Sequence, residues 1–191
     1  MIAPEQVSRI LLPRPNRQEI LQHCERKLAG NYLPDESRDR RACGLVAGVQ
    51  MEHTLDVKRI MELKRNVRDQ EPYKTYMDRI MNQYAVPSKT PLSQRGWITD
   101  PVELKECCDR CDKDNLIILG TYHTHIVPWE HDPARDTPTR LDTVLARNSN
   151  LFSFIVSMVD QTRPIIRAFY EGSTEKETLI VIRDNHRLGT N

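Results

Sequence analysis

The spacing of hydrophobic residues in the first third of the chain predicts one helix followed by two strands. Apolar residues recur every three or four positions over 15–30, as in an amphipathic helix, and this stretch ends at a glycine. Residues 43–49 are apolar and include two glycines, which indicates a buried strand. Residues 55–63 alternate between apolar and polar, which predicts a strand with one face in water.

The second half of the chain continues this alternation of helical and strand patterns. Asp100, Pro101 and Glu103 form a typical helix start, with a capping side chain, a proline in the first turn and an acid three residues after the cap. We expect that helix to run to about residue 112. The other expected elements are a buried strand over 116–122, a helix over 138–148 and strands over 151–159, 165–170 and 178–182.

Residues 66–96 show no sustained pattern. Three prolines interrupt this stretch and polar residues outnumber apolar ones, so we expect an irregular insertion with one short helix near 73–84. The chain has no internal repeat and no low-complexity linker. The sequence therefore predicts a single α/β domain over 1–191, built as a mixed sheet flanked by helices.

Charge and composition exclude several classes of partner. The chain has 28 Lys+Arg and 27 Asp+Glu, a formal net charge of +1, so nothing in its bulk charge attracts nucleic acid or an anionic membrane. Its apolar runs are far shorter than the roughly 20 residues of a membrane helix. The first residues lack a secretory signal pattern, and five cysteines, two of them adjacent, do not suggest a disulfide framework. We therefore expect a cytoplasmic protein.

Three of the cysteines, Cys107, Cys108 and Cys111, fall within one turn of the expected helix that starts at Asp100. Cys108-x-x-Cys111 is compatible with a second zinc site or a redox pair. No further cysteine pair follows at the spacing of a zinc finger. We therefore predict that these cysteines are buried or half-buried helix residues.

The most specific chemical pattern is His123-Thr124-His125, directly after the expected strand 116–122. In an extended segment, residues i and i+2 point to the same side, so both imidazoles could hold one metal ion. An isolated His-x-His pair is weak evidence, and two polar residues at a strand edge would explain it equally well.

A carboxylate follows the histidine pair at the start of the expected helix 138–148. Thr139 and Asp142 have the spacing of a capping box, in which each side chain bonds the other residue's backbone N–H. The same Asp142 could be a third metal ligand, because a carboxylate in the first helical turn projects back toward the preceding loop. Three protein ligands with an open fourth position are typical of a catalytic zinc site.

These segments resemble the JAMM metalloprotease family, in its prokaryotic-type MPN-domain form. The family's signature joins an upstream Glu, a His-Ser/Thr-His pair and a Pro-Ser-x-x-Asp run. Here the matching segments are 42–48, 120–125, 138–142 and 153–157, and the resemblance spans roughly residues 16 to 170. It implies an MPN/JAB fold with a cytidine-deaminase-like architecture. It also implies a zinc-dependent isopeptidase that cuts after the C-terminal glycine of a ubiquitin-like or sulfur-carrier-like protein.

The resemblance also assigns roles to single residues. His123, His125 and Asp142 match the zinc ligands, and Thr139 stands at the family's serine, whose hydroxyl supports the oxyanion. Thirteen residues separate His125 from Thr139, more than the family places there, so we expect an enlarged loop over 126–137. A strict residue count would choose Asp136 as the third ligand instead, which leaves it as an alternative.

Two residues of the enlarged loop allow more than one interpretation. His131 could be an extra ligand, although an exposed polar residue is the simpler reading. Trp129 could pack against the domain or line a substrate groove beside the metal.

The general base is where the chain departs most from the family. The family's glutamate position is occupied by Arg41, whose guanidinium stays protonated and cannot accept a proton from a zinc-bound water. Glu36, in Pro34-Asp35-Glu36, is the first candidate to replace it, and Glu130 in the enlarged loop is the second. The expected function is zinc-dependent hydrolysis. The alternative is a catalytically inactive MPN-type module that binds or scaffolds a ubiquitin-like partner.

Overall fold

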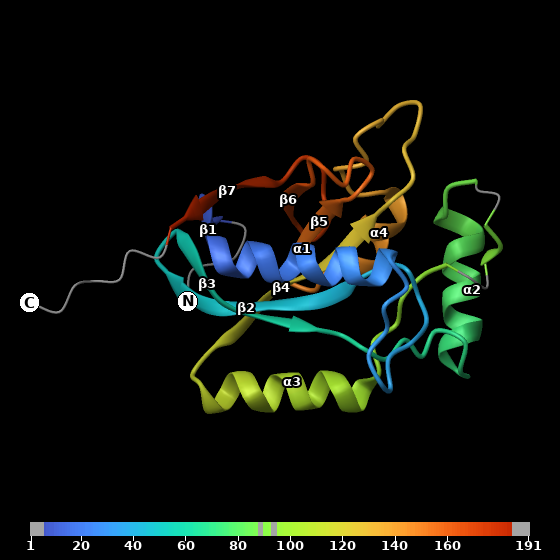
Figure 1. The fold of residues 1–191 in the computed structure, drawn as a ribbon, viewed down its shortest axis with the longest axis horizontal. Coiled ribbons are helices and arrows are strands. Elements are labelled where there is room, and N and C mark those ends of the chain that lie inside the picture. Colours follow the sequence, from blue (N-terminus) through green and yellow to red (C-terminus); the bar gives the residue numbers. More distant parts are fainter. Residues whose placement is uncertain (1–5, 88–89, 93–94, 185–191) are drawn as a thin grey trace, which may run out of the picture.

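The computed structural model describes residues 6–87, 90–92 and 95–184. Within these ranges the chain forms seven strands and four helices, and the strands close into a barrel (Figure 1). The strands are β1 (Arg9–Pro13), β2 (Cys43–Met51), β3 (Thr54–Glu62), β4 (Ile117–His125), β5 (Phe152–Ser157), β6 (Ile165–Tyr170) and β7 (Glu177–Arg183). The helices are α1 (Arg14–Leu28), α2 (Tyr73–Tyr84), α3 (Pro101–Lys113) and α4 (Arg140–Ala146).

Every helix and strand expected from the hydrophobic pattern is present. The bounds of α2 and β6 agree with the expected ranges, and α1 and α3 differ from theirs by one or two residues. The largest difference concerns β4, which continues through His125 instead of ending at Tyr122. The two histidines are therefore part of the strand, and neighbouring strands fix their backbone.

The sheet is mixed, as predicted, but it is not open. β1 pairs in parallel with both β3 and β7, and β4 pairs in parallel with β5, whereas the other neighbours are antiparallel. The strand order β1-β3-β2-β4-β5-β6-β7 closes on itself through β1. The expected mixed sheet flanked by helices did not include β1, because five residues are too few for a periodic pattern to stand out.

Helices α1 and α3 cover opposite sides of the layer formed by β2, β3 and β4 (Figure 1). The inner side of α1 joins the main core, where its residues Ile20, Cys24 and Leu28 pack with Val46, Leu119, Tyr122 and Phe154. The inner side of α3 forms a second core in which Cys107 and Cys111 pack with Leu45, Ala47, Met61 and Leu63. Since burial of apolar surface contributes about 25 cal/mol per Å², these two cores hold the layer from both sides.

The three cysteines of α3 lie as predicted, with Cys107 and Cys111 buried and Cys108 half-buried. All five cysteines of the chain are free thiols. Burial is the main cause that raises the pKa of both Cys107 and Cys111, which makes them poor nucleophiles and poor metal ligands.

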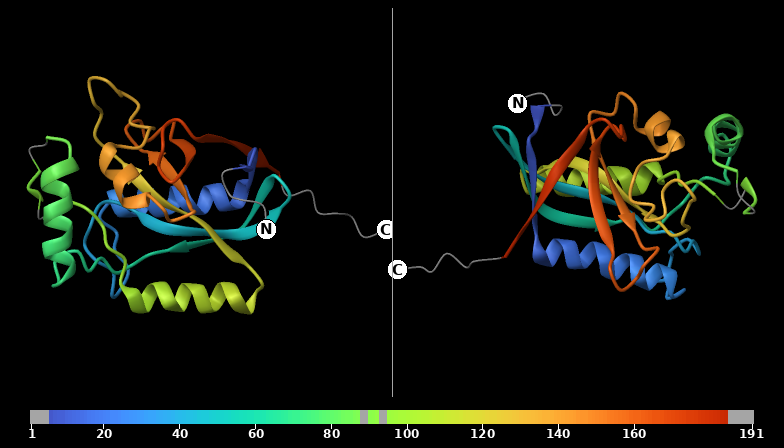
Figure 2. Two further views of the ribbon diagram at one scale, coloured as in Figure 1. Left: turned by 180° about the vertical axis from the view of Figure 1, so that it is seen from behind. Right: turned by 90° about the horizontal axis from the view of Figure 1, so that it is seen from above.

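The insertion over 66–96 places α2 beside the barrel, next to α4 (Figure 2). The side chain of Arg68 is only 2% exposed and holds this insertion together. It donates to the carbonyls of Arg95 and Leu92, both at 2.7 Å, and pairs with Asp78 of α2 at 2.6 Å. A buried arginine with these acceptors is a strong anchor, because its removal would take a hydrogen bond from each of them. No helix in the described ranges is both long and apolar enough to cross a membrane.

Candidate metal centre

The two histidines of β4 lie on one face of the barrel wall. Thr124, between them, points the other way and its hydroxyl bonds the backbone N–H and C=O of Ala42, at 2.6 and 3.0 Å. Strand alternation therefore brings the imidazoles together, and their Nε2 atoms lie 3.1 Å apart. His125 is buried, whereas 26% of the His123 side chain remains exposed, so solvent reaches the pair from the His123 side.

Asp142 completes the group from the first turn of α4. Its Oδ1 lies 3.3 Å from Nε2 of His123, and its Oδ2 lies 3.4 Å from Nε2 of His125. The predicted capping box is also present: Oδ2 accepts from the backbone N–H of Thr139 at 2.6 Å, and the Thr139 hydroxyl accepts from the N–H of Asp142 at 3.1 Å. The capping box is thus confirmed, and the same conformation of Asp142 brings its carboxylate to both histidines.

The short helix α4 is fixed from behind by the turn after β6. The hydroxyl of Thr143 donates to the carbonyl of Gly172 at 2.6 Å. Gly172 has φ +61°, and a Cβ there would lie 3.1 Å from the carbonyl oxygen of Asp142. A glycine therefore suits this turn on two grounds, and its close approach sets the position of the Asp142 backbone.

The donor atoms of the three residues lie close enough together to bind one metal ion. Zinc bonds of about 2.0–2.1 Å at tetrahedral angles place neighbouring donor atoms about 3.3–3.4 Å apart. The two Nε2 atoms lie 3.1 Å apart, Oδ1 of Asp142 lies 3.3 Å from Nε2 of His123, and Oδ2 lies 3.4 Å from Nε2 of His125. With one donor atom taken from each residue, the two nitrogens and one oxygen all lie within 4.8 Å of one another. The residues fit a zinc ion with three protein ligands.

The protonation of the group also suits a metal. Nδ1 of His125 lies 3.1 Å from the carbonyl of Arg135, which can only accept, so the proton of the neutral ring sits on Nδ1 and the Nε2 lone pair is free. Burial is the main cause that lowers the pKa of His125. For Asp142 burial raises the pKa, but the neighbouring imidazoles of His123 and His125 outweigh it and hold that pKa well below the usual range.

The alternative third ligand, Asp136, lies elsewhere. Its Oδ1 pairs with the guanidinium of Arg167 at 3.0 Å, and it does not belong to the group around the histidines. The structure thus brings Asp142, and not Asp136, to His123 and His125. The extra residues of this segment are accommodated in the loop, which projects at the top of Figure 1 in gold.

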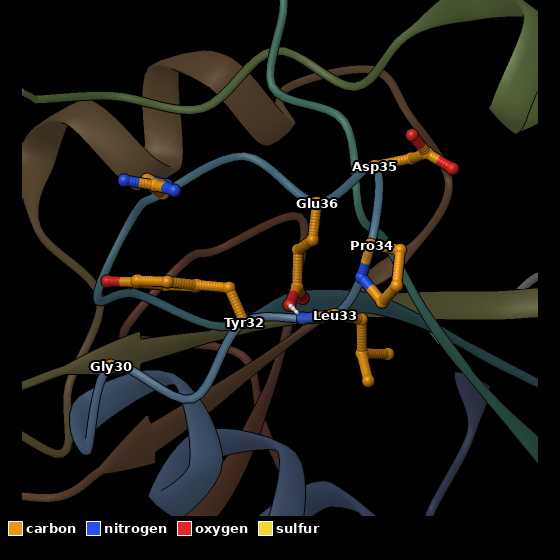
Figure 3. A pocket seen from close by; sticks show the side chains of 7 residues that line it. Gly30, Tyr32, Leu33, Pro34, Asp35 and Glu36 are labelled. Carbon is orange, nitrogen blue, oxygen red and sulfur yellow. Dashed lines mark hydrogen bonds between the residues drawn. The ribbon is translucent and has the colours of Figure 1, made fainter.

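Glu36 does not lie where a general base is needed. Its carboxylate accepts from Arg26 at 2.6 and 3.1 Å and from the N–H of Leu33 at 2.8 Å, and Lys27 lies 3.4 Å away. Figure 3 shows the side chain turned back onto Leu33, with Asp35 pointing away from it. This placement contradicts the expectation that Glu36 faces a zinc-bound water.

The electrostatics of Glu36 also argue against a role as the general base. Burial raises the pKa of this carboxyl, but hydrogen bonds from Arg26 and Leu33 and the charge of Lys27 outweigh it and lower the pKa to about 2. A carboxylate with such a low pKa and with cations on both oxygens is a poor proton acceptor. No sequence pattern indicates this pairing, because only the folded loop between Arg26 and Glu36 brings them together.

The other residues weighed for the site are on the loops around it. Arg41, directly before β2, pairs with Asp39 at 2.6 Å and donates to the carbonyl of Gly96 at 3.3 Å. Glu130 and His131 are exposed in the enlarged loop, and His131 is not among the metal-donor group. Trp129 packs beneath the guanidinium of Arg135, 3.7 Å from the ring centroid.

A second polar cluster was not predicted. Nδ1 of His23, in α1, lies 2.6 Å from the hydroxyl of Tyr122, and its Nε2 lies 3.8 Å from Glu36 and 3.9 Å from Glu62. The sequence did contain a sign of this cluster, because the polar residues His23 and Lys27 lie on the otherwise apolar, buried face of the helix predicted over 15–30.

This second cluster is unsuited to a metal, although one histidine and two carboxylates meet in it. Arg26 lies 2.6 Å from both Glu36 and Glu62, and Lys27 also faces Glu36. The carboxylates are therefore already neutralised by cations of the chain, and a divalent ion would have to displace them.

No protein-family model matches this chain, and no curated protein matches it. Among solved structures, it resembles the solution structure of protein DSY2949 from Desulfitobacterium hafniense, with a TM-score of 0.60. The match covers 92% of this chain and 93% of that chain, at 20% sequence identity. At this identity the similarity shows a shared mixed α/β fold and carries no statement about activity.

Proposed function

We propose that this chain is a zinc-dependent hydrolase of the JAMM type that cuts the bond after the C-terminal glycine of a ubiquitin-like protein. The observation that carries the proposal is the convergence of His123, His125 and Asp142, in which the two Nε2 atoms lie 3.1 Å apart and each has a carboxylate oxygen within 3.4 Å. A zinc ion held there would lower the pKa of a bound water toward about 7 and polarise a substrate carbonyl.

The order of elements around the metal centre supports an MPN-type architecture. Helix α1 precedes the Cys43-Gly44-Leu45 strand β2, and β2 pairs with β4, which carries both histidines. The third ligand comes from the helix that follows, α4, and β5 then pairs in parallel with β4. This is the sequence of segments on which the resemblance to the JAMM family rests, now arranged around one site.

The protein's own residues contribute orientation and a hydrogen-bond donor. Thr139 accepts from the N–H of Asp142, and its hydroxyl proton has no acceptor among the residues that the structure describes. That proton is available for the oxyanion of a tetrahedral intermediate, the role of the family's serine. The capping box at the same time keeps Asp142 in its place.

With Glu36 committed to Arg26, Glu130 is the remaining carboxylate for proton transfer. It is exposed, and it belongs to the same loop that carries the backbone partner of His125. A base must come within about 2.6–3.2 Å of the water, directly or through a second water, and apo geometry often tightens when substrate binds. We therefore assign proton transfer to Glu130 of this loop.

One observation favours a second function, a non-catalytic module that binds a ubiquitin-like partner. The family's base position holds Arg41, paired with Asp39, and Glu36 is in the second cluster. A domain with metal ligands but without a base would bind and not cut.

Hydrolysis of a defined fusion tests the proposal. A ubiquitin-like protein that ends in Gly-Gly, fused to a C-terminal reporter, should be cleaved by the zinc-loaded protein and not in the presence of a chelator. His123→Ala should abolish cleavage, whereas the exposed His131→Ala should preserve it. Glu130→Gln should keep zinc and reduce turnover at least about a hundredfold. Zinc-loaded protein that binds the fusion but never cuts it would establish the binding module instead.

A further inference from the structure

The enlarged loop 126–137 contacts the metal centre through the backbone of Arg135. The backbone carbonyl of Arg135 accepts from Nδ1 of the buried His125 at 3.1 Å. A histidine that binds metal through Nε2 commonly donates its other N–H in this way, which fixes both the tautomer and the ring plane. The loop therefore supplies the partner of a metal ligand from outside the strand that carries it.

The backbone of Arg135 is in an unusual conformation. Its φ is +53°, in the left-handed region that a residue with a Cβ adopts rarely. Such a conformation persists only where the surrounding structure holds it, and it is concentrated at functional sites. Here it sets the direction of the carbonyl that meets His125.

The side chain of Arg135 shows what holds the conformation. The residue is only 9% exposed, and its guanidinium stacks over Trp129 with 3.7 Å between Cζ and the ring centroid. Asp132 faces the same guanidinium at 3.9 Å. The arginine is thus clamped between an aromatic ring and a carboxylate of its own loop.

Both parts of this clamp are fixed in turn. Trp129 and Asp132 exchange backbone hydrogen bonds at 3.1 and 3.3 Å, and the N–H of Arg135 donates to the carbonyl of Asp132 at 3.1 Å. The carboxylate of Asp132 also accepts from the Thr137 hydroxyl at 2.6 Å. On the barrel side, the hydroxyl of Ser157 in β5 donates to the carbonyl of Ala134. The loop is therefore a compact folded unit attached to the strand next to the histidines.

We propose that Arg135 is a positioning residue for the metal centre: its side chain, clamped by Trp129 and Asp132, holds the left-handed backbone that aims its carbonyl at Nδ1 of His125. On this proposal, the extra residues between His125 and Asp142 serve to orient the imidazole of His125. It presets the tautomer in which Nε2 of His125 presents its lone pair to a metal. This inference rests on the metal site of the proposed function, but not on turnover.

Zinc affinity in a set of matched variants tests the proposal. Arg135→Ala removes the clamp and keeps a Cβ that disfavours positive φ, so zinc affinity should fall about 10- to 100-fold, the usual cost of losing a partner outside the ligand set. Arg135→Gly also removes the clamp but accepts positive φ readily, so it should regain part of the loss. Trp129→Leu should resemble Arg135→Ala. Arg163→Ala, which removes an exposed arginine far from the loop in sequence, is the matched control and should bind zinc like wild type.

The tautomer of His125 gives a second readout that needs neither zinc nor substrate. Nitrogen chemical shifts of the imidazoles in the metal-free protein should show the proton of His125 on Nδ1 in wild type and a mixture of tautomers in Arg135→Ala. Equal zinc affinity and an unchanged tautomer in a folded Arg135→Ala would overturn the proposal, as would equal losses in the Ala and Gly variants. Wild type that binds no zinc, yet keeps the Nδ1 proton only when Arg135 is present, would sink the proposed function and leave this inference standing.

Discussion

The hydroxyl of Tyr122 lies 2.6 Å from Nδ1 of His23 in α1. In β4, Tyr122 directly precedes His123, the first histidine of the metal centre. Because side chains alternate along β4, the strand serves a buried polar cluster on its inner face and the metal centre on its other face. Gly44 on the paired strand leaves room for this arrangement, since a Cβ there would lie 2.2 Å from the Tyr122 ring.

The first prediction concerns the pH dependence of folding. Burial, the largest cause, together with the charge of Arg26 lowers the pKa of His23 from 6.5 to about 3. Between these values the unfolded chain takes up a proton that the native protein does not, so stability falls as pH falls. From pH 6.5 to 5.0, with chelator present, wild type should lose about 1.5 kcal/mol more than His23→Gln in urea unfolding. The exposed His53→Gln should behave like wild type, and equal losses in all three proteins would show that His23 is protonated in the folded state.

The second prediction concerns Glu36, whose side chain is fully buried between cations. Glu36→Gln should destabilise the protein by about 3–5 kcal/mol, because Arg26 and Lys27 lose a buried anionic partner. Its zinc content should remain that of wild type, since Glu36 lies outside the metal centre. Urea unfolding and metal analysis measure the two quantities, with Glu130→Gln as the exposed control. A variant of unchanged stability that has lost turnover would restore Glu36 as the general base.

The stability that Glu36 contributes should also depend on pH in a defined direction. Its pKa is about 2 in the folded protein, so the contribution is complete above the ordinary value of 4.5 and disappears as pH falls toward 2. In Glu36→Gln the unfolding midpoint should change less over this range than in wild type. A steeper change in the variant would contradict the pairing of Glu36 with Arg26.

The third prediction distinguishes the two carboxylates of the segment after His125. Asp142→Ala should lose most of the bound zinc, because it removes one of three ligands. Asp136→Ala breaks only the ion pair with Arg167 and should retain the metal. Metal content after dialysis against a weak chelator measures both. Zinc loss in Asp136→Ala with retention in Asp142→Ala would mean that the loop adopts another register in solution.

The fourth prediction separates the two roles of Thr139. Thr139→Val removes the capping acceptor and the hydroxyl donor, so stability should fall by about 1 kcal/mol and turnover should fall as well. Thr139→Ser keeps the hydroxyl and should restore both. Thermal unfolding and cleavage of the Gly-Gly fusion are the measurements. Turnover that is unaffected in Thr139→Val would remove the hydroxyl from the reaction and leave it as a cap.

The local geometry of His123, His125 and Asp142 could be predicted because its signals are local. His123 and His125 share a face by strand alternation alone, and the Thr139–Asp142 spacing specifies a capping box within one helical turn. The four helices and the strands other than β1 were also found from their patterns, since each is long enough to show one. The sequence alone could not decide between Asp142 and Asp136 as the third ligand, because the path of the folded loop determines which carboxylate reaches the histidines.

The features that escaped prediction depend on contacts between distant segments. β1 is recognisable only by its pairing with β3 and β7, and Glu36 meets Arg26 through the turn that follows α1. Arg135 gives no signal in the sequence, because its part in the site comes from a backbone carbonyl and a φ value. Sequence patterns report side-chain type and spacing, and these three features are set by tertiary geometry.

The parallel pairing of β1 with β7 has a consequence for how the molecule assembles. Arg9 lies opposite Leu179, so the seam of the barrel joins strands from opposite ends of the described chain. Closing so long a loop carries a large entropic cost and favours late formation, whereas the β2–β3 hairpin joins neighbouring segments. The metal ligands belong to β4 and α4, in the middle of the chain. We therefore expect them to be in place before β1 pairs with β7. During synthesis on a ribosome, β7 would emerge last of the seven strands, and its pairing with β1 would close the curved sheet into a barrel.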